Sequence, residues 1–276
     1  MSVHRLQKTG RLHAHEAIKT LRKEFRTAAA DVNTLYDVAQ SGANRYAQSG
    51  ARGTAPTGSD VFSKIRERAG WPRAEVGCGK GIRIGMIDTT IDPRHEAFNG
   101  RRIIRKSFHD PGADSGSTLH GTAVAAMLVG KPSAEGFGGL LPEAKLYAAN
   151  IFQRDENGEN RADLMALAQA IDWLATAIDV GLSAYRKANR GRYIDFAAPG
   201  VDVWTAIPGG GKFQTGSSFA APYGTAAVAL AVVGGVRNSP RDIRAHLKAF
   251  AVDAGEPGRN DTFGWGVIKL DQPCGI

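Results

Sequence analysis

The fold is decided by the run Ile82-Arg83-Ile84-Gly85-Met86-Ile87-Asp88, a short apolar segment that ends in a carboxylate. Its isoleucines favour a buried strand. The pairs Thr89-Thr90 and Asp92-Pro93 follow directly and indicate a turn. The sequence therefore predicts a strand whose carboxyl end carries Asp88.

Segments of two kinds alternate along the rest of the chain. Apolar residues at helical spacing, and a Ser-Pro start for the last helix, predict helices over 120–130, 161–177, 218–233 and from residue 239 onward. Runs typical of strands occupy 145–151, 193–198 and 201–206. Strands that alternate with helices favour an α/β fold, in which a doubly wound parallel sheet carries helices on both faces.

The chain is predicted to have three parts. Residues 1–36 contain a basic amphipathic helix, whose apolar stripe over 14–25 suits either packing on a neighbour or a membrane surface. Residues 37–68 are rich in Ala, Gly, Ser and Gln, as flexible linkers are. Residues 69–276 are expected to form one globular domain.

Charge and hydropathy exclude several function classes. The 276 residues include 35 Lys and Arg against 27 Asp and Glu, a net charge of +8. Much of that excess lies in residues 1–36, so the remainder is nearly balanced, which argues against a nucleic-acid-binding surface. No apolar run approaches the length of about 18 residues that a membrane-spanning helix needs. The sequence begins without the apolar segment of a secretory signal. The sequence does not predict an oligomeric state.

Metal and cofactor sites are not predicted. Cys78 and Cys274 are the two cysteines, which form either one long-range disulfide or two buried thiols. The His-Glu pairs at 15–16 and 95–96 lack the second histidine of zinc peptidases. The glycines of 77–81 precede the first strand, whereas a dinucleotide-binding loop follows one.

Three polar side chains occupy positions where reactive groups collect in such a sheet. Asp88 ends a strand, His120 begins a helix and Ser218 lies at the head of another. Singly, each has a simpler interpretation as a turn or capping residue. Acyl transfer, however, needs a hydroxyl nucleophile, an imidazole that takes its proton and a carboxylate that holds the imidazole. Together the three residues therefore predict a catalytic triad.

The segments around these residues resemble the Asp, His and Ser motifs of the subtilisin-like serine peptidases, the subtilase family, in the family's chain order. They are Asp88-Thr89-Thr90, His120-Gly121-Thr122 and Gly216-Ser217-Ser218-Phe219-Ala220-Ala221-Pro222. Thr90, Ser217 and Phe219 stand where many members have Gly, Thr and Met. Residues 194–200 resemble the family's Ala-Pro-Gly turn, and 263–266 resemble its C-terminal Gly-x-Gly signature.

The resemblance covers about residues 76–271, and it implies a fold and an activity. The fold would be the subtilisin-like three-layer α/β arrangement. The activity would be that of a serine endopeptidase acting on polypeptides, with Asp88, His120 and Ser218 as its triad and no cofactor. Residues 13–36 also resemble the end of a pro-segment, and family members are often secreted.

The resemblance is interrupted between the second and third motifs. His120 and Ser218 lie 98 positions apart, markedly fewer than in the family. Residues 178–180 resemble the start of the next family strand, whereas 185–191 resemble a loop several elements downstream. Central strands, walls of the substrate pocket and the asparagine of the oxyanion hole are therefore expected to be missing between about 178 and 185.

Two functional interpretations follow from this shortening. The chain is either a serine endopeptidase, whose activity the missing segments would impair, or a catalytically incompetent remnant or binding protein. No side-chain donor for the oxyanion is identified, since neither Asn150 nor Asn189 matches the family's position. Because residues 178–192 do not replace the lost strands, we expect low thermal stability and exposed sheet edges.

Overall fold

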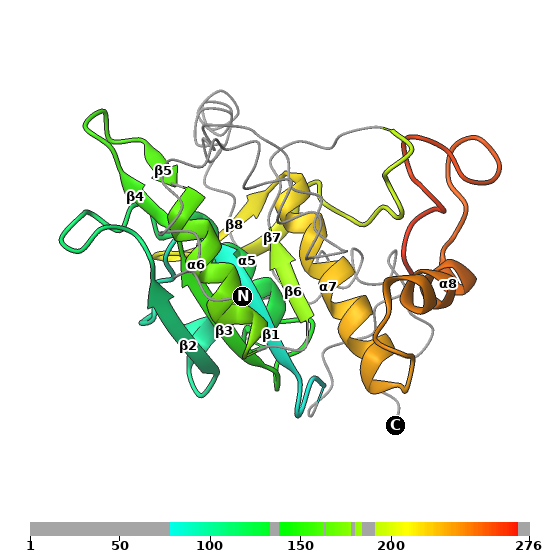
Figure 1. Cartoon of the computed structure of the whole chain (residues 1–276), viewed down its shortest axis with the longest axis horizontal. Coiled ribbons are helices and arrows are strands. Elements are labelled where there is room, and N and C mark those ends of the chain that lie inside the picture. Colours follow the sequence, from blue (N-terminus) through cyan, green and yellow to red (C-terminus); the bar gives the residue numbers. More distant parts are fainter. Residues whose placement is uncertain (1–77, 133–137, 163, 178–179, 184–190, 270–276) are drawn as a thin grey trace, which may run out of the picture.

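Four parallel strands form the central sheet of the structure, a computed structural model that describes residues 78–132, 138–162, 164–177, 180–183 and 191–269. The strands are β1 (Arg83–Asp88), β2 (Arg102–Ser107), β3 (Lys145–Asn150) and β6 (Val180–Ser183). They lie in the order β2-β3-β1-β6, and each pairing between neighbours is parallel (Figure 1). The predicted parallel α/β sheet is confirmed.

The register of the sheet brings strand ends together. Asp88 at the end of β1 and Ser107 at the end of β2 both lie opposite Asn150 of β3. The carboxyl ends of these three strands therefore share one edge, where a parallel sheet gathers its reactive groups.

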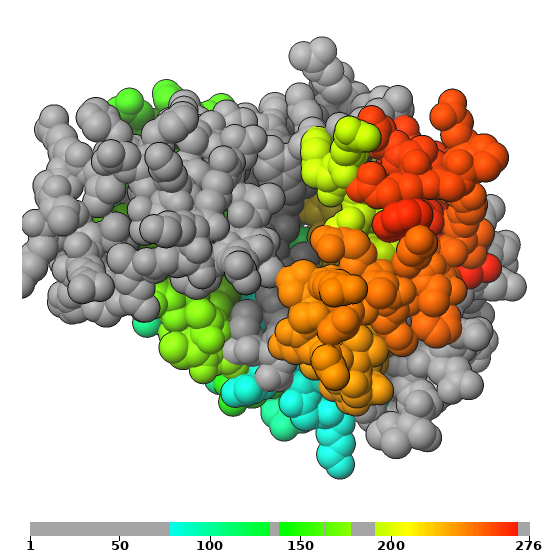
Figure 2. Space-filling view, turned by 45° about the vertical axis from the view of Figure 1, so that its right-hand side comes forward, coloured from blue at the N-terminus to red at the C-terminus, as the bar shows by residue number. Residues whose placement is uncertain are grey.

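Helices cover both faces of the sheet. α5 (Leu119–Val129) and α7 (Ser217–Val233) pack on one face, and α6 (Leu164–Ala175) packs on the other (Figure 1). α8 (Pro240–Phe250) lies outside α7, and Figure 2 shows the two helices side by side at the surface. This is the three-layer arrangement that the alternation of strands and helices predicted.

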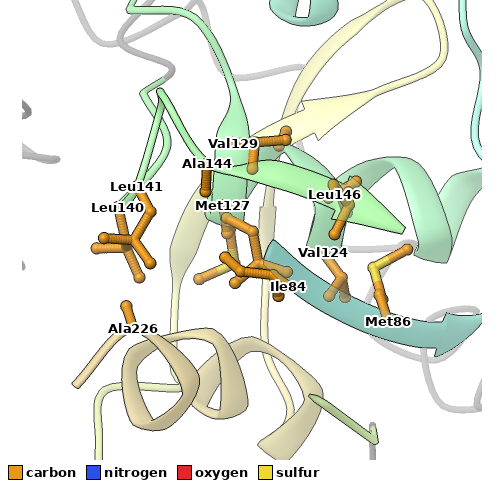
Figure 3. Packing of buried hydrophobic residues seen from close by; sticks show 14 of the residues in the cluster. Ile84, Met86, Val124, Met127, Val129, Leu140, Leu141, Ala144, Leu146 and Ala226 are labelled. Atoms are coloured by element: carbon orange, nitrogen blue, oxygen red, sulfur yellow. The ribbon is translucent and has the colours of Figure 1, made fainter. Parts of the chain in front are cut away.

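The main core lies between the sheet and α5 and α7. Figure 3 shows Ile84 and Met86 of β1 and Leu146 of β3 facing Val124 and Met127 of α5. These side chains are at most 2 % exposed. Small residues dominate the inner surfaces of both helices, so the helix backbones lie close to the sheet.

Two short hairpins and one helical turn complete the described elements. The hairpins join β4 (Phe152–Arg154) to β5 (Asn160–Ala162) and β7 (Val203–Ile207) to β8 (Gly210–Gln214). The turn, η1 (Glu96–Phe98), follows β1. The β7–β8 hairpin packs against α5, with Val203, Trp204 and Ala206 in the main core.

The prediction of a strand over 193–198 is wrong. Only isolated bridges form there, from Phe196 to Gly264 and from Ala197 to Val267. The partner segment contains Gly264 and Gly266 at φ values of 62° and 120°, outside the strand conformation. Hydrogen bonding between these two segments therefore stops after single residue pairs and does not continue as a strand ladder.

Several sequence-based expectations lie outside the described residues. These concern the helix and pro-segment in 1–36, the linker at 37–68, and positions 178–179 and 184–190 of the shortened stretch. Cys78 is buried and disulfide-bonded, whereas Cys274 lies outside the described range. In the part of the chain that the structure describes, no helix is both long enough and apolar enough to span a membrane.

Candidate active site

Asp88 is held rigidly at the end of β1. Its side chain is 2 % exposed, and Oδ1 accepts a hydrogen bond of 2.6 Å from the backbone N–H of Thr89. A buried carboxylate needs such partners, because burial without them is costly. The strand thus presents one carboxylate, fixed in orientation, at the sheet edge.

His120 supplies the other partner of that carboxylate. It is the second residue of α5, and its Nδ1 lies 2.7 Å from Oδ1 and 2.9 Å from Oδ2 of Asp88. An ionised carboxylate only accepts hydrogen bonds, so Nδ1 carries the proton. In the neutral ring Nε2 is then unprotonated and able to accept a proton from another group.

Two opposing effects act on the pKa of His120. Burial of the ring lowers the pKa, whereas the charge of Asp88 and its hydrogen bond raise it, and the net result is a pKa above the usual 6.5. The imidazolium form is therefore stabilised by its partner. A base in an acyl transfer reaction needs this property, because it becomes positively charged during the reaction.

Two threonine hydroxyls join the segment after Asp88 to the helix of His120. Thr89 Oγ1 accepts from the N–H of Gly121 at 2.9 Å, and Thr122 Oγ1 accepts from the N–H of Asp92 at 2.9 Å. A Cβ on Gly121 would lie 2.2 Å from the carbonyl oxygen of Thr89. Only glycine permits this close approach, which sets the distance between Asp88 and His120.

Ser218 lies at the start of α7, as its second residue. The preceding turn is anchored by a 2.8 Å hydrogen bond from the N–H of Gly216 to the carbonyl of Gly200. Since the first N–H groups of a helix have no partner within it, the N–H of Ser218 is available to an external acceptor. Pro222 lacks an N–H, so the carbonyl of Ser218 also has no α-helical partner.

The structure joins Asp88 to His120 directly and brings the segment of Ser218 close to them. The ring of Phe219, the next residue, lies against the imidazole of His120 with 5.6 Å between ring centroids. Among the described residues, no hydrogen bond links Ser218 to His120. The predicted pair of Asp88 and His120 is thus in contact, and Ser218 adjoins it through its neighbour.

Asn150, at the carboxyl end of β3, already has hydrogen-bond partners for its side chain. Asn150 donates from Nδ2 to the carbonyl of Ser115 at 3.4 Å and accepts the N–H of Phe152 at 2.9 Å. Asn189 lies outside the described residues.

A pocket of about 230 Å³ lies beside Asp88 at the carboxyl ends of the strands. It is lined by Thr89, Thr90, Ile91, Arg105, Lys106, Ser107, Ala148 and Asn150. The ammonium of Lys106 lies over the rings of Phe108 and Trp173, at 4.8 Å and 5.7 Å. No group of three or more His, Cys, Asp or Glu residues suited to a metal ion occurs in the described ranges.

Sequence reasoning did not assign roles to Thr89 and Thr122. Both lie in the quoted segments around Asp88 and His120, directly after Asp88 and two positions after His120. Their positions next to Asp88 and His120 could have indicated a structural role, because hydroxyls often bond to nearby backbone N–H groups. Their partners lie on the other segment, so the sequence alone does not reveal the pairing.

Comparison with known sequences gives a consistent set of similarities. The model of the subtilase family matches residues 79–183. The chain is 26 % identical over 252 residues to the minor extracellular protease Epr of Bacillus subtilis, covering 69 % of this chain and 38 % of Epr. It is 28 % identical over 220 residues to subtilisin-like protease 1 of Trichophyton verrucosum, covering 56 % and 54 %. The chain thus spans about two fifths to one half of these relatives.

Solved structures share the architecture. Fervidolysin from Fervidobacterium pennivorans, a keratinolytic enzyme related to subtilisin, is similar with a TM-score of 0.58 and 20 % identity, over 78 % of this chain and 44 % of fervidolysin. Sphericase is similar with a TM-score of 0.55 and 14 % identity, over 76 % and 97 % of the two chains. These similarities show a common fold.

Proposed function

The chain belongs to the subtilase family of serine peptidases, and we propose that it hydrolyses peptide bonds of polypeptides through Asp88, His120 and Ser218. The observation that carries the proposal is the 2.7 Å contact between Nδ1 of His120 and Oδ1 of Asp88. This contact directs the unprotonated Nε2 away from the carboxylate. Ser218 is the second residue of α7, and the ring of the next residue, Phe219, lies against the same imidazole.

The reaction proceeds through an acyl-enzyme. Oγ of Ser218 attacks the carbonyl carbon of the substrate while its proton passes to Nε2 of His120. The imidazolium, stabilised by Asp88, then protonates the leaving amine, and the acyl group remains on Ser218 as an ester. A water molecule gives its proton to His120 and attacks the ester, which releases the carboxylic acid and restores Ser218.

The oxyanion of each tetrahedral intermediate would be stabilised by the N–H of Ser218 and the positive end of α7. The asparagine side chain that usually adds a second donor has no counterpart among the described residues. In subtilisin, the member that gives the family its name, removal of that donor costs about 10²–10³ in turnover. We therefore expect slow hydrolysis from this chain.

A non-catalytic role is the second candidate. It is favoured by the lack of a hydrogen bond between Ser218 and His120 within the described residues. A protein of this kind would bind polypeptides without cleaving them. The two candidates differ in whether the hydroxyl of Ser218 is activated.

Hydrolysis of casein by the purified full chain tests the proposal. We expect slow cleavage that disappears in Ser218→Ala and persists in Ser217→Ala, which removes the neighbouring hydroxyl. Cleavage that survives Ser218→Ala would come from a contaminant or another site. A complete lack of cleavage in every variant, together with retained binding of casein, would support the non-catalytic candidate.

A further inference from the structure

We propose that the β7–β8 hairpin fixes the position of Ser218 relative to His120, and that Thr205 and His95 are the positioning residues that anchor this hairpin. The inference rests on the proposed function of the same site. The hairpin lies next to α5 and leads directly into the turn before α7 (Figure 1). It therefore connects the part of the fold that carries His120 to the segment that carries Ser218.

Thr205 anchors the middle of the hairpin to the helix of His120. Its side chain is 2 % exposed, and its Oγ1 donates a 2.7 Å hydrogen bond to the carbonyl of Ala123. Ala123 follows His120 by three residues on α5, so the accepting carbonyl belongs to the first turns of that helix. The bond thus ties β7 to α5 close to the proposed base.

His95 anchors the far end of the hairpin to the segment that follows Asp88. The residue is 7 % exposed. Its Nδ1 accepts the N–H of Ala97 at 3.1 Å, which requires that Nε2 carry the proton in the neutral ring. Nε2 therefore donates to the carbonyl of Gly210, the first residue of β8, at 3.0 Å.

The base of the hairpin is closed beside Ser218. Val203 of β7 lies opposite Gln214 of β8, and the N–H of Asp202 donates to Oγ1 of Thr215 at 3.0 Å. The next residue, Gly216, is bonded to Gly200. Only Ser217 then separates Gly216 from Ser218. A shift of the hairpin relative to α5 is therefore transmitted to Ser218 with little intervening chain to absorb it.

A matched pair of substitutions tests the Thr205 anchor. Thr205→Val replaces the hydroxyl by a methyl group of similar size, whereas Thr205→Ser keeps the hydroxyl and removes the methyl group. Misplacement of a reacting group by about 1 Å can cost about 10²-fold in rate. We expect Thr205→Val to slow reaction of Ser218 with a fluorophosphonate by about ten- to a hundredfold, with kcat for peptides falling and KM nearly unchanged. Thr205→Ser should restore most of the rate.

A second pair of substitutions distinguishes the contributions of the two hydrogen bonds of His95. The amide nitrogen of Gln in His95→Gln reaches approximately the position of Nε2 and keeps the bond to Gly210. The amide oxygen of Asn in His95→Asn takes approximately the position of Nδ1 and keeps only the bond from Ala97. We expect His95→Asn to lose more labelling rate than His95→Gln, even where both have the same thermal midpoint.

A measurement independent of activity keeps this inference separate from the proposed function. In NMR spectra, proton contacts between the rings of Phe219 and His120 report the distance between the two segments. They should be present in the wild type and Thr205→Ser and weakened in Thr205→Val. If the wild type is not labelled but the ring contacts follow this pattern, the proposed function fails and the positioning role stands. Equal ring contacts in all variants, or equal labelling of Thr205→Val and Thr205→Ser, would overturn the positioning role.

Discussion

Nδ1 of His120 and Oδ1 of Asp88 lie 2.7 Å apart, although the two residues are separated by 32 positions in the sequence. The contact joins the end of β1 to the first turn of α5. Hydroxyls of Thr89 and Thr122 bond across the same junction, and Gly121 permits the close approach. The imidazole of His120 and the carboxylate of Asp88 are thus in contact in the absence of any substrate.

Replacing this carboxylate should abolish most of the activity. In Asp88→Asn the amide no longer enforces protonation at Nδ1, and a ring protonated at Nε2 cannot accept the proton of Ser218. We expect kcat for peptide hydrolysis to fall by about 10⁴-fold. Asp92→Asn, on the same segment but outside the contact with His120, serves as the control and should retain kcat within a small factor. Similar losses in both variants would point to a general disturbance of the segment.

The same substitution should change the titration of His120. In the wild type Asp88 outweighs the effect of burial and raises the pKa of His120 above 6.5. Without the charge of Asp88, burial remains and disfavours the imidazolium. The pKa of His120 in Asp88→Asn should therefore drop, as measured by NMR titration of the ring protons. An unchanged pKa would show that Asp88 does not control the base.

The raised pKa of His120 also predicts a pH dependence of stability. A group whose pKa is higher in the folded than in the unfolded state binds protons preferentially when folded. Its stabilisation is complete below the unfolded pKa and is lost as the pH rises through the folded pKa. Urea denaturation of the wild type and of His120→Gln should show a larger difference in unfolding free energy on the acid side of this window. A difference that grows with pH would have the wrong sign.

Two glycine substitutions should have opposite effects on stability. In Gly121→Ala the new Cβ would lie 2.2 Å from the carbonyl oxygen of Thr89, so the helix of His120 must move. We expect a loss of about 1–3 kcal/mol in unfolding free energy, as for overpacking elsewhere. In Gly224→Ala, within α7, no atom lies within 4 Å of the new Cβ. That change should stabilise the protein by about 0.5–1 kcal/mol, and thermal unfolding of both variants measures the contrast.

Local sequence signals were sufficient for β1 and α8. The run ending at Asp88 forms β1, and the predicted helix starting with Ser239 and Pro240 is α8, where Oγ of Ser239 accepts the N–H of Asp242. In both cases the determining interactions lie within a few residues of one another. Periodicity and capping residues therefore contain the necessary information.

Elements that depend on a pairing partner rather than on their own composition were not predictable in this way. β8 begins with Gly210 and Gly211, residues that disfavour strands, and forms because β7 pairs with it. The segment over 193–198 has the composition of a strand, yet its partner near Gly264 permits only isolated bridges. The anchoring bonds of Thr205 and His95 reach residues 82 and 115 positions away, so no local pattern reveals them.

Labelling with a fluorophosphonate probe shows whether Ser218 is an activated nucleophile. The probe reacts with a serine hydroxyl only when a base removes its proton. We predict that mass spectrometry will find one adduct on Ser218 in the wild type and in Ser217→Ala, and none in Ser218→Ala. Labelling should be much slower in His120→Gln, and its rate should rise with pH through the pKa of His120. A folded wild-type chain that remains unlabelled, or equal labelling rates in the wild type and His120→Gln, would show that His120 does not activate Ser218.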